Sequence, residues 1–147
     1  MKRGTCVVDN SLILRKLSAL DEYLKQIEEY TSLTVKAYSD DWKVQRIVER
    51  TLQMMIETCL DISGHIIADE KLRVPDTYAD TFRILVENGI LSWSHLGAFE
   101  KMAKFRNIVV HDYEKIDPEI VVGILRKNRQ DFEEFKASII KYLKSEP

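Results

Sequence analysis

The stretch RNIVVHDY, residues 106–113, places an arginine, an amide, an imidazole, a carboxylate and a phenol around three β-branched apolar residues. The residues before it, from Leu96 to Val110, carry apolar side chains at helical spacing, which predicts a helix that ends near this stretch. Residues 106–113 are therefore either a reactive site or the polar end of an ordinary helix.

Arg106 is unusual because it falls on the apolar face of this predicted helix. It follows Phe99 by seven residues and Met102 by four, so the three side chains share one face. Unpaired arginine is almost never fully buried. We therefore expect Arg106 to be paired, or to face a cleft or a subunit interface.

Helical geometry separates Arg106 from His111. Five residues place the two side chains about 140° apart around a straight helix, whereas Tyr113 returns to within about 20° of Arg106. Asn107 and His111 lie four residues apart on one face, where the amide can bond the imidazole. Two arrangements would bring arginine and histidine into one site: the helix ends at His111, or two copies of it meet across a two-fold axis.

The rest of the 147-residue chain shows helical periodicity and no alternating strand pattern. Caps and apolar spacing predict long helices over about 10–38, 41–68, 94–110 and 117–144, and a short one over about 77–87. The sequence predicts an all-α fold: a single domain, residues 1–147, formed by an antiparallel bundle of four long helices with one short inserted helix.

A row of polar residues follows one face of the predicted second helix. Its members are separated by steps of four, three, four and four residues: Arg46, Arg50, Gln53, Glu57 and Asp61. The row is either a solvated surface or a polar wall in which the two acids pair with arginines elsewhere. We expect part of it, drawn from Arg46, Arg50, Glu57 and Asp61, to line a cleft.

Composition excludes several classes of function. The net charge of −2 provides no overall basic field for nucleic acids, although a local patch remains open. Cys6 and Cys59 have no metal or CxxC spacing, which favours a reducing, cytoplasmic setting, and Cys59 falls within an apolar stripe as a small buried residue. No apolar run approaches the length of about 20 residues that spans a membrane. The sequence predicts no cofactor, because it has no Gly-rich phosphate loop, and no metal site.

Histidine beside arginine, with no neighbouring serine or cysteine nucleophile, suits RNA cleavage by the adjacent 2′-hydroxyl. Histidine can take or give a proton near neutral pH. Arginine can bind the phosphate and stabilise its developing charge. From the residues alone, a structural helix end remains the alternative.

The spacing Arg106-x4-His111-x-Tyr113 resembles the RX4HXY signature of HEPN-domain proteins, and nearly the whole chain is similar to the HepT-like toxin family. The similarity also covers the charged helix 46–66, the segment 78–90 and the approach 101–107. It implies a HEPN-like homodimer with Arg/His sites in a cleft at the dimer interface.

The resemblance further implies a toxin of a type II HEPN/MNT toxin-antitoxin system that cleaves RNA without a metal ion. Its partner would be an MNT-type nucleotidyltransferase antitoxin that transfers AMP from ATP to Tyr113. Carried over by residue, Arg106 would bind phosphate, His111 would act as acid and base, and Asn107 would support the site. Asp112 receives no catalytic role.

Two alternatives remain open. In the first, the chain is a non-catalytic helical module that serves as the substrate-binding or partner subunit of a nucleotidyltransferase, since some HEPN relatives are non-catalytic. In the second, the chain is a plain helical adaptor, which would leave Arg106 unexplained.

Overall fold

The computed structural model describes residues 10–145, and every regular element in that range is helical. The helices are α1 (Asn10–Ile27), α2 (Val35–Asp40), α3 (Trp42–Asp69), α4 (Tyr78–Glu87), α5 (Leu96–His111), α6 (Pro118–Lys127) and α7 (Arg129–Ser145). Three short 3-10 turns join them: η2 (Glu28–Tyr30), η3 (Trp93–His95) and η4 (Tyr113–Lys115). The predicted all-α fold is confirmed.

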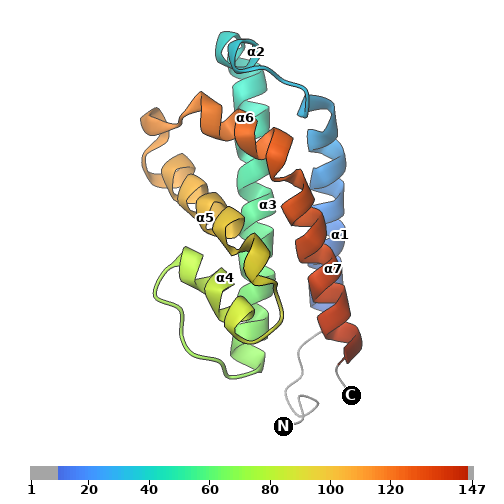
Figure 1. The fold of residues 1–147 in the computed structure, drawn as a ribbon. Coiled ribbons are helices and arrows are strands. Elements are labelled where there is room, and N and C mark those ends of the chain that lie inside the picture. Colours follow the sequence, from blue (N-terminus) through green and yellow to red (C-terminus); the bar gives the residue numbers. More distant parts are fainter. Residues whose placement is uncertain (1–9, 146–147) are drawn as a thin grey trace.

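The long helix α3 is the centre of the bundle (Figure 1). It packs against α1 on one side and against α4 and α5 on the other, while α7 packs along α1. The short helices α2 and α6 contact each other at the end of the bundle where α3 begins. This arrangement leaves α5 inclined across α3, with the end of α5 near the start of α3.

Three phenylalanines fix the position of α5. The rings of Phe82 and Phe99 stack at 5.0 Å, and Phe135 meets them edge-on at 6.4 and 5.8 Å. All three are buried, and they come from α4, α5 and α7. Such pairs contribute about 0.5–1.5 kcal/mol each beyond the burial of their area. They anchor the first turn of α5, so that its far end carries the polar stretch 106–113.

The predicted first helix is wrong in its length, because α1 ends at Ile27 rather than near Tyr38. The segment TSLT, 31–34, contains hydroxyls that bond to the backbone and compete with the helix. Thr31 Oγ1 donates to the carbonyl of Glu28 at 3.0 Å, and Thr34 Oγ1 accepts from the Ala37 amide at 3.0 Å as the N-cap of α2. The turn directs Tyr38 inward, where it is 2% exposed.

The predicted fifth helix is also wrong, because it is two helices, α6 and α7, separated at Asn128. Asn128 Nδ2 donates to Asp131 Oδ2 at 2.9 Å, and the Asn128 carbonyl accepts from the Asp131 amide at 3.1 Å. These local bonds replace helical ones. Within residues 10–145, the bundle thus has four long helices and three short ones. The expected start is confirmed: Pro118 is the first residue and Asp117 caps it.

Cys59 is buried, as expected, and burial raises the pKa of its thiol above the usual range. Cys6 lies outside the described residues. Over residues 10–145, no helix has both the length and the apolar character needed to cross a membrane.

The N-cap of α4 provides a stability prediction. Thr77 Oγ1 accepts from the Asp80 amide at 3.0 Å, so Thr77→Ala removes the cap. We expect it to lower the free energy of unfolding by about 1 kcal/mol, the usual cost of losing such a cap. Urea denaturation checks this, with Ser18→Ala on the exposed side of α1 as the control. Equal midpoints for Thr77→Ala and the parent protein would show that the cap contributes nothing.

Candidate active site

The helix α5 ends at His111. The Asp112 amide makes the last helical bond, to the Ile108 carbonyl at 2.9 Å, and Asp112 itself leaves the helix with φ −147° and ψ 48°. Of the two arrangements that the spacing allowed, the single chain shows the first, in which the helix stops at the histidine. Tyr113 then follows in η4, so the spacing of side chains around α5 does not set its direction.

His111 lies in an open groove between the end of α5 and the start of α4. The groove has a volume of about 630 Å³. Lys104, Asn107 and His111 line it from α5, and Tyr78 lines it from the first turn of α4. His111 and Asn107 are exposed, so the imidazole is accessible to a bound molecule. This is the one predicted catalytic group that the structure places directly in a groove.

Salt bridges hold the wall of the groove that faces α5. Arg73 donates two bonds to the Asp80 carboxylate, both at 2.7 Å, and bonds Glu87 at 3.0 Å. The Asp76 amide donates to the same Asp80 side chain at 2.9 Å. The Arg73 bonds and then the Asp76 amide lower the pKa of Asp80 to about 2. Asp80 therefore stays ionised and ties the connection between α3 and α4 to the α4 helix.

Arg106 lies beside this groove without lining it, and it pairs with α3. Its Nε donates to Glu57 Oε2 at 2.9 Å, and its Cζ lies 4.7 Å from the ring centroid of Tyr78. The side chain is only 15% exposed. The expectation that Arg106 is paired is confirmed, as is the expected pairing of Glu57 with an arginine from elsewhere. Because one chain satisfies Arg106, its burial does not by itself require a second copy.

Two residues connect Arg106 to the groove of His111. Asn107 accepts a bond from Arg106 Nη1 at 3.2 Å through its side-chain oxygen, and it also lines the groove. Tyr78 stacks beneath the guanidinium and lines the groove as well. The guanidinium has five N–H donors, so it can bind a phosphate while it keeps its hydrogen bonds to Glu57 and Asn107. Asn107 and Tyr78 therefore lie between Arg106 and the groove that His111 lines.

Tyr113 is held at the other end of the stretch. Its hydroxyl donates to Glu49 and accepts from Arg46, and the Arg46 Cζ lies 5.0 Å from the centre of its ring. Burial, followed by the hydrogen bond to Glu49 and the charge of that residue, raises the pKa of Tyr113 to about 12. Arg46 opposes this rise. The residue is nevertheless 39% exposed.

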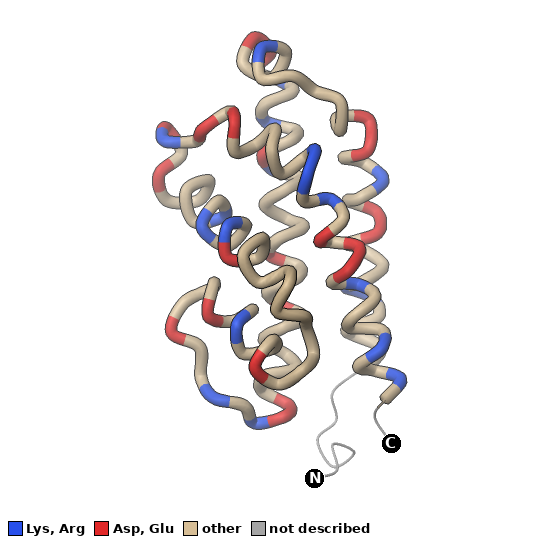
Figure 2. The backbone as a smooth tube through the Cα atoms, in the orientation of Figure 1, with Lys and Arg blue, Asp and Glu red and all other residues tan. Residues whose placement is uncertain are grey.

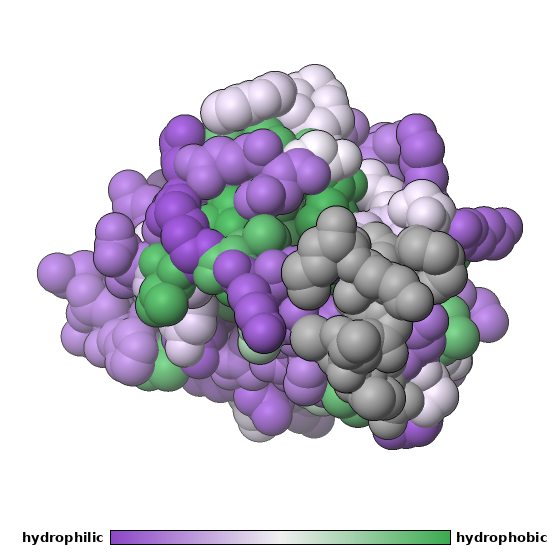
Figure 3. All heavy atoms as spheres, turned by 90° about the horizontal axis from the view of Figure 1, so that it is seen from below, coloured by the Kyte–Doolittle hydropathy of each residue, from purple (hydrophilic) through white to green (hydrophobic). Residues whose placement is uncertain are grey.

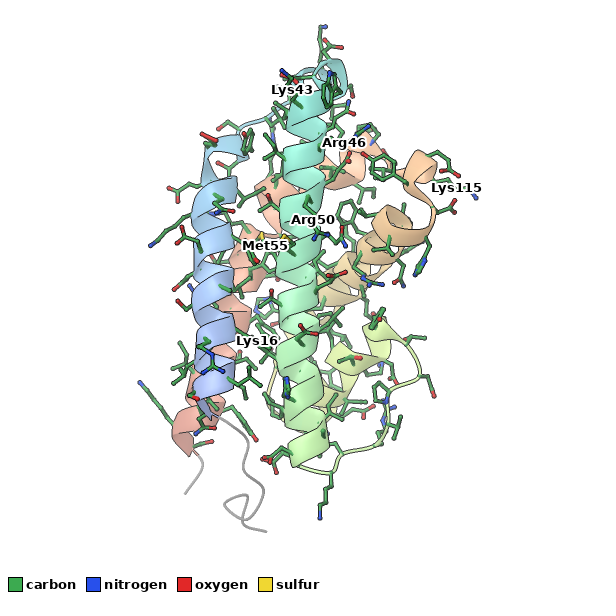
Figure 4. All side chains as sticks on the ribbon, turned by 180° about the vertical axis from the view of Figure 1, so that it is seen from behind. Lys16, Lys43, Arg46, Arg50, Met55 and Lys115 are labelled. Carbon is green, nitrogen blue, oxygen red and sulfur yellow. The ribbon has the colours of Figure 1, made fainter. Side chains whose placement is uncertain are left out.

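The charged row of α3 divides between two neighbours. Arg46 contacts Tyr113, and Glu57 contacts both Arg106 and Gln53, the latter at 3.1 Å. Arg50 is exposed between them, and Figure 4 shows Arg46 and Arg50 on the side of α3 that faces α5. Asp61 pairs with Lys16 of α1 at 3.4 Å and lines a separate hollow together with Tyr78. Arg46 and Glu57 contact the 106–113 stretch directly, and none of the four expected residues lines the groove of His111.

The sequence analysis did not predict Glu49 as a site residue. Glu49 is buried, at 4% exposed, and it accepts the hydrogen bond of the Tyr113 hydroxyl. A signal was present: Glu49 lies three residues before Leu52 and seven before Ile56, on the apolar face of α3. A charged residue on the apolar face of a helix is the same anomaly that drew attention to Arg106. Lys104 and Tyr78 were not predicted as site residues either, since only the fold brings α4 against α5.

The charges of α5 favour an anionic ligand. The helix contains Lys101, Lys104 and Arg106 but a single acid, Glu100, and Figure 2 shows basic segments along its middle. Within residues 10–145, no group of three or more His, Cys, Asp or Glu side chains is placed to hold a metal ion. The groove itself combines the imidazole of His111 with one cationic side chain, Lys104, and two carboxylates, Asp76 and Asp112.

A second hollow lies at the opposite end of the bundle. It has a volume of about 540 Å³ and is lined by the ends of α3 and α7 and by the segment 88–92. Seen from this end, apolar side chains gather near the centre of the surface with polar ones around them (Figure 3). None of the predicted site residues lines this hollow, so the groove of His111 remains the candidate site.

Comparison with known proteins agrees with the fold and the motif. The family model described as ribonuclease HepT-like matches residues 20–139. The chain is 30% identical to the mRNA nuclease HepT of Shewanella oneidensis over 126 residues, which cover 86% of this chain and 94% of the relative. It is 26% identical to the tRNA nuclease HepT of Aphanizomenon flos-aquae, covering 92% of each chain.

A solved structure gives the same result. The tri-AMPylated Shewanella oneidensis HEPN toxin, in complex with MNT antitoxin, is similar with a TM-score of 0.79 and 29% identity. The match covers 88% of this chain and 96% of that one. The matched family region contains the groove, the Arg106–Glu57 pair and Tyr113. This chain belongs to the ribonuclease HepT-like family.

Proposed function

We propose that this protein is the toxin of a HEPN/MNT toxin-antitoxin pair and cleaves RNA as a metal-independent endoribonuclease. One observation carries the proposal: in a chain of the ribonuclease HepT-like family, an exposed His111 lies in an open groove beside a fixed Arg106. We further propose that it acts in the cytoplasm, where a free thiol such as that of Cys59 persists.

The proposed reaction uses the RNA as its own nucleophile. A 2′-oxygen attacks the adjacent phosphorus, and the bond from phosphorus to the 5′-oxygen breaks. His111 takes the 2′ proton or supplies a proton to the leaving oxygen. Arg106 binds the phosphate and stabilises its added negative charge, and Asn107 keeps the guanidinium oriented. The products are a 2′,3′-cyclic phosphate and a 5′-hydroxyl.

One histidine per site performs only one of the two proton transfers, which supports a homodimer with two such sites facing one cleft. Val110, next to His111 in the last turn of α5, is 40% exposed and offers apolar surface to a second copy. Arg46 and Arg50 would add positive charge to the same cleft and attract RNA.

The proposed partner is an MNT-type nucleotidyltransferase antitoxin that transfers AMP to Tyr113. Two features of this chain support Tyr113 as the acceptor: the residue is 39% exposed, and it lies two residues from His111. An AMP group here would carry negative charge to the edge of the RNA groove. It would repel the RNA backbone and occupy space next to the imidazole.

The test is RNA cleavage in the presence of excess EDTA. We expect the purified protein to cleave labelled single-stranded RNA and to leave cyclic phosphate ends, detectable by mass spectrometry, because the proposed groups require no metal ion. Messenger and transfer RNA are both suitable substrates, since the two named relatives differ in this respect. If the protein cleaved neither messenger nor transfer RNA, the result would contradict the proposal.

A second candidate is a non-catalytic partner subunit of a nucleotidyltransferase. The observation that favours it is the bond between Arg106 and Glu57, which gives the arginine a structural role without RNA. This candidate predicts AMP transfer to Tyr113 together with no RNA cleavage. The EDTA assay separates the two.

A further inference from the structure

A buried carboxylate connects Tyr113 to the core. Glu49 is 4% exposed, and each of its oxygens accepts one phenol: Oε1 that of Tyr113 and Oε2 that of Tyr38. The Arg46 guanidinium lies 3.8 Å from Oε1. Burying a carboxylate is costly unless hydrogen bonds and a counter-charge compensate, and all three partners together provide both. The cluster joins α2, α3 and η4, which meet only in the folded chain.

The two phenols differ in access. Tyr38 is 2% exposed, and burial together with its bond to Glu49 raises the pKa of its hydroxyl above the usual range. It therefore acts as a permanent donor to Oε2. Tyr113 as a whole is 39% exposed. Glu49 thus connects the interior to the hydroxyl of a partly exposed residue.

We propose that Glu49 is the general base for AMP transfer to Tyr113, and that Arg46 stabilises the charge that develops on the phenol oxygen. This rests on the proposed function. In the step, Tyr113 Oη forms a bond to the α-phosphorus of ATP, and the bond from that phosphorus to the β-bridging oxygen breaks. Pyrophosphate leaves, and the phenol proton moves to Glu49 Oε1.

The acceptor needs such a base. At neutral pH, a phenol with a pKa of about 12 is ionised in only about one molecule in 100,000. A carboxylate that already accepts the phenol hydrogen bond can remove the proton as the new bond forms. Arg46 donates to the same oxygen from the solvent side, with a side chain that is 53% exposed. The reactive oxygen is therefore prepared within this protein rather than by its partner.

The test compares Glu49→Gln with Glu70→Gln. Glu70 also accepts a tyrosine hydroxyl, that of Tyr142, but at the other end of α3. Each variant is mixed with the cognate nucleotidyltransferase, Mg²⁺ and ATP, and AMP addition is followed by intact-protein mass spectrometry from pH 6 to 9. We expect Glu49→Gln to slow the transfer by about 100-fold or more, and Glu70→Gln to leave it unchanged.

The pH profile separates a base from a structural residue. We expect the parent rate to be nearly level across this range, since the base is a carboxylate. The residual rate of Glu49→Gln should rise about tenfold per pH unit, because hydroxide then takes the proton. Glu49→Asp should recover part of the rate and the level profile. The parent profile alone decides the matter if Glu49→Gln fails to fold: a tenfold rise per unit would overturn the inference.

Two negative results have different meanings. Normal transfer to Glu49→Gln would overturn the role of Glu49 and leave the proposed function intact. Absence of AMP on Tyr113 in the parent protein would overturn the proposed modification, and the role of Glu49 with it.

Discussion

Replacing His111 with alanine should lower the rate of RNA cleavage by about 100-fold to 10,000-fold. This is the usual contribution of a positioned acid or base, and His111 is the only imidazole that lines the groove. The measurement is single-turnover cleavage of labelled RNA in EDTA. His65→Ala is a matched control, because His65 is exposed on α3 and does not line the groove of His111.

Arg106→Ala extends this test with a necessary check on stability. Its removal deprives Glu57 of a partner at 2.9 Å and Tyr78 of its stacked guanidinium. We therefore expect reduced cleavage and a lower melting temperature. Arg83→Ala is the control, since Arg83 makes a comparable pair with Glu100 at 2.8 Å away from the groove. Full activity in both His111→Ala and Arg106→Ala would reject the catalytic assignment.

Replacing Tyr113 with phenylalanine should abolish the AMP adduct completely, because the acceptor oxygen is removed. Phenylalanine keeps the ring beside Arg46 and costs the Glu49 carboxylate one hydrogen bond, worth about 1.5–3 kcal/mol. Intact-protein mass spectrometry after incubation with the cognate nucleotidyltransferase and ATP measures the adduct. After the same incubation with nucleotidyltransferase and ATP, the Tyr113→Phe protein should still cleave RNA, whereas the parent protein should be inhibited.

Tyr30→Phe controls for the loss of a tyrosine hydroxyl elsewhere, in η2. It should be modified and silenced like the parent protein. An adduct that persists in Tyr113→Phe would place the modification on another residue. An unmodified Tyr113→Phe protein that is nevertheless silenced would indicate inhibition by binding alone.

These predictions treat residues 106–113 as two sites that share one helix end. His111 faces the α4 groove, whereas Tyr113 faces the start of α3. The helix ends between them, at His111, so helical spacing does not set the direction of Tyr113. The non-helical Asp112 thus lies between His111, which lines the groove, and Tyr113, which is held by α3.

The sequence by itself determined the helical class and most helix boundaries. Helical periodicity reflects which side chains leave water, and it is readable wherever an apolar stripe is continuous, as along α3 and α5. It also exposed the anomaly of Arg106, because an arginine on an apolar face needs a partner. The two wrong boundaries fall at 31–34 and at Asn128, where side chains bond to neighbouring groups and interrupt a stripe that otherwise continues.

Only the tertiary structure decided which partners these residues have. Glu57 lies 49 residues from Arg106, and Glu49 lies 64 residues from Tyr113, so no local spacing could pair them. Those pairs form because the stacked phenylalanines incline α5 across α3 and bring the polar end of α5 to the charged row. A motif specifies which chemical groups are present, whereas the packing of distant helices decides which face a groove and which are tied to the core.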